Sequence, residues 1–448
     1  MADRGEMAPR RGCRRRRRLP LWPPVSRILW RLYQRPPVAH LPGRKRKRKS
    51  DGEAAREGCG GMAPRRGLPA PPLEDDDLLA EILLRLPPRP SSLPRAAAVC
   101  RLWRLLVSDP SFHRRFRAHH REPPLLGLLQ APHYHISFTP AMDLPDRIPT
   151  ARFSLRIPDA VSSYILGCRH GRVLLMNPKW LHFLVWVPMT GDQHRVALPP
   201  GFDGKEHKHL QNGAIACAAG DQGHMHGACH SSPFQVVFLG RSPERVFACA
   251  YSSETEAWGN LISLLWPPST FHVSTNYPNT MVGNSIYWLL HGHIVSIIQF
   301  DLDRQSLAVI EAPPDAFEFE DFYDGICDLR ITPADGAELG FLVFSRTSAQ
   351  LWKRNTNSVG VSEWVLGNTI ELKELNDAFS RWHPKLLGLD EDDNMMFLWT
   401  SDEDVFAVHI ESGKFRKLPE KMIHRRPCYP LKSFYTAAVT REYLLNVI

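Results

Sequence analysis

The feature that most constrains this chain is a pattern of short apolar runs that recurs along residues 122–448. In each copy a strand-like run is followed by a polar turn, a second run and then Leu-Pro or Ala-Pro. The clearest copies are Val185–Pro200, Phe300–Pro314 and Val405–Pro419, and weaker ones are Ala250–Trp258 and Leu351–Trp364. Runs this short, separated by turn residues, predict an all-β domain. The one short helix that we predict here covers Thr369–Phe379.

The spacing of these copies indicates how the strands are grouped. Neighbouring copies lie about 50–60 residues apart, which is close to the length of one four-stranded propeller blade. A single sheet of this kind cannot bury both of its faces, so a ring of such sheets is the usual solution. The available length gives about six blades. A pair of packed β-sheets is the structural alternative.

Two turn-and-strand segments in this region resemble a known family. Gly167–Leu175 and Gly283–Leu290 each have a small turn that leads into an apolar strand, which resembles the kelch-like F-box-associated β-propeller of plant F-box proteins. Residues 122–448 lack the paired glycines of kelch repeats and the Trp-Asp dipeptide of WD repeats. The resemblance implies that residues 125–445 form a β-propeller-like domain.

Residues 73–120 have a helical pattern instead. Leu78, Ile82 and Leu86 stand four residues apart, which predicts one apolar face on a short helix. We predict three short helices, whose limits are marked by Pro87-Pro88, by capping residues Ser91-Ser92 and by Ser108-Asp109-Pro110. So small a unit buries little surface and gains stability by packing against something else.

This helical stretch resembles the F-box. The segments that carry the resemblance are Leu78–Pro88 and Val99–Phe112, in which several fixed spacings agree at once. We place the F-box at residues 70–120, so the predicted fold is α+β with several domains. The resemblance implies docking on a Skp-type adaptor, and through it on cullin and RING subunits.

Nine residues are candidates for the adaptor interface or its immediate support. By similarity these are Leu78, Leu79, Ile82, Leu83, Pro87, Val99, Cys100, Trp103 and Leu106. The alternative for each residue is a place in the small core of the helical unit, because leucines at helical spacing serve a core more often than a partner.

Residues 1–67 are predicted to be a disordered basic tail. They hold 20 Lys/Arg against 5 Asp/Glu and little periodic apolar content. The basic runs Arg14–Arg18 and Arg44–Lys49 indicate nuclear import or contact with polyanions, or are simply solvated charge. Residues 122–448 hold 27 Lys/Arg against 36 Asp/Glu, which argues against nucleic-acid binding outside the tail.

Composition also limits the compartment. Nine scattered cysteines, an odd number without a Cys-x-x-Cys pair, suggest reduced thiols in the nucleus and/or cytoplasm. No run of about 18 apolar residues exists, so we expect no membrane span.

The sequence gives little support for a metal site or for covalent catalysis. Residues 203–230 are rich in possible zinc ligands, but the spacing fits no common ligand pattern, and we expect no metal or cofactor. The His and Cys residues concerned are His207, His209, Cys217, His224, His226, Cys229 and His230. The acidic clusters Asp390–Asp393 and Asp402–Asp404 precede strands, so we interpret both as hairpin turns held in water, not as paired catalytic carboxylates.

An acidic loop with aromatic residues is the candidate for target recognition. Phe317, Phe319, Phe322 and Tyr323 stand among acidic residues, and exposed aromatics are frequent anchors at protein interfaces. We predict that this loop forms part of a substrate-facing rim. The alternative is a loop folded down over a blade.

These expectations together describe a non-catalytic substrate-recognition subunit of an SCF-type cullin–RING E3 ubiquitin ligase. The F-box would dock on the adaptor, and the propeller would bind an unknown protein target for ubiquitination. The alternatives are a scaffold outside ubiquitination, a nuclear polyanion-binding protein that uses the basic tail, and a propeller enzyme.

Overall fold

A computed structural model describes most of the chain after residue 75. The described ranges are 76–132, 135–157, 163–177, 179–202, 209–218, 229, 232–265, 270–273, 277–292, 295–317, 328–334, 338–345, 348–356, 362–372 and 384–435. The predicted basic tail, residues 1–67, therefore lies outside the described residues.

Residues 76–120 form a helical unit. Its elements are α2 (Asp76–Leu84), α3 (Ser92–Ala97), α4 (Arg101–Ser108) and α5 (Pro110–His120). Asp76 and Asp77 place negative charge at the start of α2, where the helix dipole favours it. Asp109 caps α5, because its carboxylate accepts a hydrogen bond from the Ser111 backbone N–H at 3.1 Å. In the described part of the chain, no helix is both long and apolar enough to cross a membrane.

The helical unit differs from the prediction in one detail. The second predicted helix is divided into α3 and α4, because the Val99 N–H bonds the Ala96 carbonyl in a tight turn (3.1 Å) and Cys100 is extended. Ser91 stands at the N-cap of α3, but its side chain makes no capping bond. Its hydroxyl donates instead to Asp146 Oδ1 at 2.6 Å, in the connection that follows β2.

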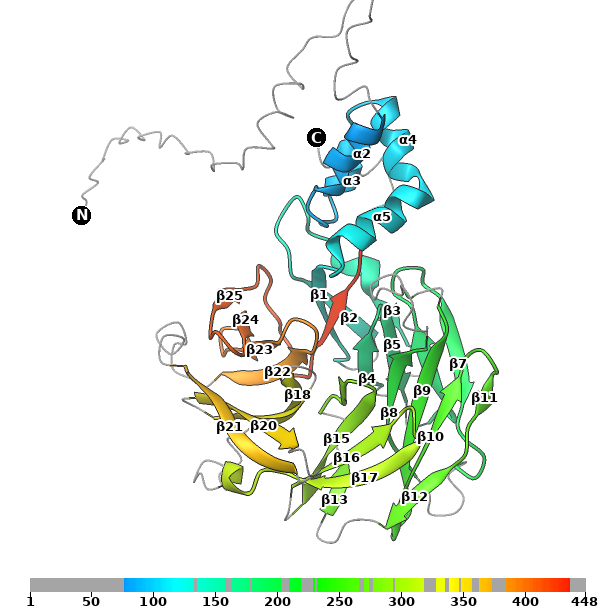
Figure 1. The fold of residues 1–448 in the computed structure, drawn as a ribbon, viewed down its shortest axis with the longest axis vertical. Coiled ribbons are helices and arrows are strands. Elements are labelled where there is room, and N and C mark those ends of the chain that lie inside the picture. Colours follow the sequence, from blue (N-terminus) through cyan, green and yellow to red (C-terminus); the bar gives the residue numbers. More distant parts are fainter. Residues whose placement is uncertain are drawn as a thin grey trace, which may run out of the picture. The chain divides into compact units, whose positions relative to one another are not determined.

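The described strands after residue 124 form six sheets (Figure 1). Blade 1 has β26 (Tyr429–Lys432), β1 (Leu125–Gln130), β2 (His135–Pro140) and β3 (Leu155–Arg156), and blade 2 has β4 (Tyr164–Arg169), β5 (Arg172–Met176), β6 (His182–Trp186) and β7 (Gln193–Ala197). Blade 3 has β8 (His209–Cys217), β9 (Phe234–Arg241), β10 (Arg245–Ser252), β11 (Ala257–Trp258) and β12 (Ile262–Leu265). Blade 4 has β13 (Thr270–Val273), β14 (Thr280–Val282), β15 (Ser285–Gly292), β16 (Ser296–Asp301) and β17 (Ser306–Glu311). Blade 5 has β18 (Asp328–Ala334), β19 (Glu338–Phe344), β20 (Ser348–Thr356) and β21 (Ser362–Glu371), and blade 6 has β22 (Lys385–Asp390), β23 (Met395–Trp399), β24 (Val405–His409) and β25 (Phe415–Lys417).

The buried apolar side chains show that these sheets close into a ring. Each of six hydrophobic clusters contains residues from two successive blades. One cluster joins blade 6 to blade 1 through side chains that include Phe397 and Leu128. Blade 1 is completed by the late strand β26, in which Tyr429 pairs with Leu129 and Lys432 with Leu125. The domain is thus a six-bladed β-propeller, as the spacing of the sequence pattern predicted.

The recurring sequence pattern has a structural explanation. Its three clear copies are the hairpins formed by the third and fourth strands of blades 2, 4 and 6. After each fourth strand, the backbone N–H of Leu198, Ala312 or Leu418 donates to a carbonyl at the start of the third strand, at 2.8–3.4 Å. The proline that follows has no N–H, so it ends the pairing there.

One predicted helix is wrong where the structure describes it. Thr369–Glu371 belong to β21, where they pair with the first residues of β20. Long-range strand pairing here outweighs the helical pattern of the sequence. Leu372 follows the strand and is buried, and residues 373–379 lie outside the described residues.

Candidate functional site

Helix α2 carries two apolar stripes that face different surroundings. Leu79 and Leu83 are fully buried in the helical unit. Leu78 and Ile82, each one position earlier, are 50% and 39% exposed. Both pairs have i, i+4 spacing, so each forms its own stripe along the helix. One stripe of α2 therefore fills the unit's own core, and the other remains open to a partner.

The other candidate adaptor residues divide in the same way. Val99, Pro87 and Cys100 are exposed, whereas Trp103 is buried and Leu106 is half-buried. The exposed residues are candidates for direct contact with an adaptor. The buried ones can support the interface only by holding the helices in place.

Leu105 was missed by the sequence analysis. It lies on α4 and is 61% exposed. Trp103 and Val107 are the buried residues of this helix, and Leu105 lies midway between them in sequence, on the opposite side. A leucine two positions from each residue of a buried stripe is the signal that could have revealed it.

The structure describes only part of the predicted target-facing rim. Phe317 ends the 3₁₀ helix η3 (Pro314–Phe317), in the connection from β17 to the inner strand β18. Phe319, Phe322 and Tyr323 lie outside the described residues. The rim remains a prediction.

The His- and Cys-rich segment is likewise only partly described. His209 and Cys217 stand at opposite ends of β8. Eight residue steps along an extended strand span about 26 Å, so these two residues cannot share a metal ion. His207, His224, His226 and His230 lie outside the described residues. Within the described ranges no group of three or more His, Cys, Asp or Glu could hold a metal ion.

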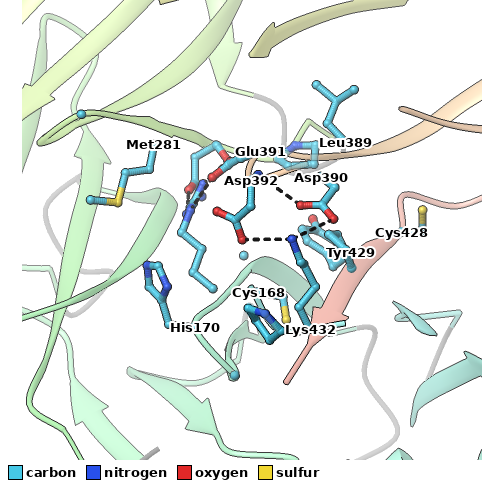
Figure 2. A pocket seen from close by; sticks show the side chains of 18 residues that line it. Cys168, His170, Met281, Leu389, Asp390, Glu391, Asp392, Cys428, Tyr429 and Lys432 are labelled. Carbon is cyan, nitrogen blue, oxygen red and sulfur yellow. Dashed lines mark hydrogen bonds and ion pairs between the residues drawn. The ribbon is translucent and has the colours of Figure 1, made fainter. Parts of the chain in front are cut away.

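A pocket lies at one mouth of the propeller's central channel (Figure 2). Its volume is about 250 Å³, and its walls include the ends of the inner strands β4, β22 and β26 and residues on either side of β14. The last residues of these three strands are Arg169, Asp390 and Lys432. Sheet topology therefore brings together three charged residues that are far apart in the sequence.

Lys432 is the cationic centre of one half of the pocket. Its side chain is 7% exposed, and its Nζ lies 3.5 Å from Asp390, 3.6 Å from Asp392 and 2.9 Å from Asp393. Figure 2 shows the lysine reaching toward Asp390 and Asp392 across the pocket. Asp390 is itself held in a turn, because its Oδ1 accepts the backbone N–H of Asp392 at 3.1 Å.

Arg169 organises the other half. Its guanidinium forms a two-point ion pair with Glu391, at 2.9 Å and 2.6 Å. It also donates to the side-chain and backbone oxygens of Asn279. His170 and Gly171 follow directly and both have positive φ, as a two-residue hairpin between β4 and β5 requires. This tight turn fixes where Arg169 leaves the strand.

Burial controls the protonation of the pocket. It raises the pKa of Asp390 to about 6, against the opposing effect of Lys432 and with the help of Asp393 and Asp392. Burial alone would lower the pKa of Lys432, but the three carboxylates outweigh it and raise that pKa. Burial also raises the pKa of the Cys168 thiol to about 12. This cysteine is therefore protonated near neutral pH and is a poor nucleophile.

The prediction that Asp390–Asp393 form a turn held in water needs correction. The segment is a turn between β22 and β23, but Asp390 is buried and Glu391 is bound to Arg169. The cations that draw them inward are 222 and 42 positions away in the sequence, on β4 and β26. The second cluster is closer to the prediction, because Asp402 is exposed in a turn and Asp404 pairs with Lys417 at the surface.

Comparison with known proteins agrees with this architecture. A family described as "F-box protein AT5G49610-like, beta-propeller" matches residues 164–432, more than half of the chain. The chain belongs to this plant F-box protein family. A second description, "F-box-like", matches residues 76–119, the helical unit. No curated protein matches the chain significantly.

Solved structures similar to this F-box protein are distant. A functionally unknown protein from Desulfotomaculum acetoxidans has 9% identity and a TM-score of 0.37, with 69% of this chain and 100% of that chain covered. A chain of a nidogen/laminin complex has 10% identity and a TM-score of 0.37, with 68% and 96% covered. Apo AztD from Citrobacter koseri has 10% identity and a TM-score of 0.34, with 69% and 86% covered.

Membership of the F-box family has two direct implications. An F-box domain implies binding to a Skp-type adaptor, and F-box adaptor families are typically non-catalytic. The exposed stripe of α2 is a candidate for this contact.

Proposed function

We propose that this F-box protein is the substrate-recognition subunit of an SCF-type cullin–RING E3 ubiquitin ligase. The helical unit docks on a Skp-type adaptor, which connects it to the cullin and RING subunits. The propeller binds the protein target. The complex works in the nucleus and/or cytoplasm, which agrees with the scattered cysteines of the chain.

One observation carries this proposal: the helical unit leaves four large apolar side chains partly open to water. They are Leu78, Ile82, Val99 and Leu105. Complete burial of such a side chain is worth about 1.5–3 kcal/mol, and these side chains have about half of that still to gain. Together they supply roughly 3–6 kcal/mol, a large part of the 8 kcal/mol or so that micromolar affinity requires.

The mechanism of such a subunit is proximity. A target held on the propeller has its lysines near activated ubiquitin at a high effective concentration. The bond is made by the other subunits, so no residue of this chain needs to act as a nucleophile. The protonated Cys168 thiol in the channel pocket is consistent with this division of labour.

Adaptor binding by the full chain tests the proposal. Ile82→Glu and Leu105→Glu place charge on the exposed apolar surface, so each is expected to weaken affinity for a Skp-type adaptor at least tenfold, or about 1.4 kcal/mol. The matched control is Leu181→Glu, which changes a leucine that is 57% exposed on the propeller and should leave the affinity unchanged. Calorimetric titration measures affinity, and thermal unfolding confirms that each variant folds.

The proposal fails if the folded wild-type chain does not bind the adaptor. It fails equally if both glutamate variants bind as tightly as Leu181→Glu. A ubiquitination assay with an assembled complex then asks whether a target captured by the propeller is modified only when the Ile82 surface is intact.

A further inference from the structure

The channel pocket has more negative charge than its own cations can balance. Asp390, Glu391 and Asp392 line it together with Arg169 and Lys432, and Asp393, outside the lining, also pairs with Lys432. Both cations are already engaged by carboxylates at 3.6 Å or less. The pocket therefore repels an anionic ligand and attracts a cation.

The unbalanced charge lies on the open side of the pocket. The side chain of Asp392 is 64% exposed, whereas those of Asp390 and Lys432 are buried. The ion pair of Asp392 with Lys432 is long, at 3.6 Å. Its carboxylate thus keeps acceptor capacity for a group that enters from solvent.

Size limits what can enter. A volume of about 250 Å³ is below the roughly 300–1,000 Å³ of sites for drug-sized ligands. It suffices for one extended side chain. A bare metal ion is a poor alternative, because no described group of acidic, His or Cys residues is arranged to hold one.

We propose that this pocket receives a single basic side chain, arginine or lysine, from the protein target. This inference rests on the proposed function, since it names a recognition element for the target that the propeller holds. The cationic group lies against Asp392, and the apolar part of the side chain passes Met281 and Leu389 in the wall. Arg169 and Lys432 keep the carboxylates in place for it.

The protonation of Asp390 supports the same conclusion. Burial is the main cause of its raised pKa, and repulsion from Asp393 and Asp392 raises it further against the opposing effect of Lys432. A further cation beside these carboxylates offsets that repulsion, so the pocket favours a basic side chain over a neutral one.

Short labelled peptides test the inference with the full chain. The probes are fluorescein-labelled Gly/Ser peptides with one central arginine, lysine or, as the neutral control, glutamine. Fluorescence anisotropy is expected to show the arginine or lysine peptide binding at least tenfold more tightly than the glutamine peptide. Asp392→Lys is expected to abolish this preference. The matched control Asp303→Lys, in an exposed turn of blade 4, should retain it.

Two outcomes overturn the inference. One is equal binding of all three peptides, or binding of none, by folded wild-type protein. The other is a preference that survives Asp392→Lys, which would place the basic side chain elsewhere. The same preparations are tested for adaptor binding. If the wild-type chain binds the adaptor but shows no peptide preference, only the inference about the pocket is refuted. If the wild-type chain does not bind the adaptor, the proposed function is refuted.

Discussion

Asp390 is a buried carboxylate whose neighbours act on its pKa in opposite directions. Burial, Asp393 and Asp392 raise this pKa, Lys432 lowers it, and the result is a value of about 6. A carboxyl whose pKa is higher in the folded than in the unfolded state favours folding while it is protonated. Its contribution is therefore full below pH 4, near the unfolded pKa, and is lost as the pH rises through about 6.

Asp390→Asn tests this linkage. Asparagine imitates the protonated carboxyl and can still accept the Asp392 N–H. Between pH 4.5 and pH 7.5, the wild type is expected to lose about 2 kcal/mol of unfolding free energy relative to this variant. Urea unfolding at the two pH values measures the difference. Parallel pH profiles would show that Lys432 holds the pKa of Asp390 near its ordinary value.

Contacts between neighbouring blades of the propeller also depend on single tryptophan side chains in the outer strands. The Trp258 indole N–H donates to the Ala197 carbonyl at 2.9 Å, which ties blade 3 to blade 2. The Trp364 indole N–H donates to the Glu311 carbonyl at 2.9 Å, which ties blade 5 to blade 4. In both cases the acceptor is the last residue of the preceding blade's fourth strand. The same link is thus built twice, two blades apart.

Trp364→Phe is expected to lower the unfolding free energy by about 1 kcal/mol. It removes this hydrogen bond and keeps an aromatic ring beside Phe341. Val365→Ala, on the same strand at an exposed position, is the control and should stay within about 0.5 kcal/mol of the wild type. Denaturant unfolding of the full chain measures both. A Trp364→Phe protein as stable as the control would mean that solvent replaces the bond at no cost.

Hairpins could be predicted from the sequence because their signals are local. Turn residues and the closing Leu-Pro lie within one copy of the pattern, and the structure confirms a six-bladed ring. The division of the second helix at Cys100 and the strand at Thr369–Glu371 could not be predicted in this way. Both depend on backbone pairing or packing that cannot be recognised from the local spacing of apolar residues.

The charged residues of the channel pocket were even harder to predict from local sequence signals. Arg169, Glu391 and Lys432 come from three different strand ends, and nothing within a short window of sequence relates them. Of the candidate adaptor surface, the sequence indicated Leu78 and Ile82 but could not separate them from the buried Leu79 and Leu83. That separation depends on which side of α2 the other helices cover.

Closure of the whole ring relies on close contact between blade 6 and the chain just before β26. A Cβ atom added at Gly388, on inner strand β22, would fall inside the contact distance of the Cys428 carbonyl oxygen. The Cys428 backbone N–H also donates to the Leu387 carbonyl at 3.0 Å, so the two segments cannot easily move apart. Only glycine fits at this position.

Gly388→Ala is therefore expected to destabilise the propeller by about 1–3 kcal/mol, the usual cost of overpacking. Gly259→Ala is the matched control, because a Cβ there would lie 3.4 Å from the nearest atom, an ordinary contact. Thermal unfolding of the full chain should show a lower midpoint for Gly388→Ala only. Equal midpoints would mean that the segment before β26 can shift without loss.

The pairing of β26 with β1 also bears on how the protein is made. About 300 residues separate these strands, which at 5–20 residues per second is roughly 15–60 s of synthesis. Throughout that interval the inner edge of β1, with Leu128 and Leu129, lacks its partner on the ribosome-bound chain. A nascent chain of this kind is exposed to aggregation until β26 emerges, and we expect it to engage chaperones that shield open β-edges during that time.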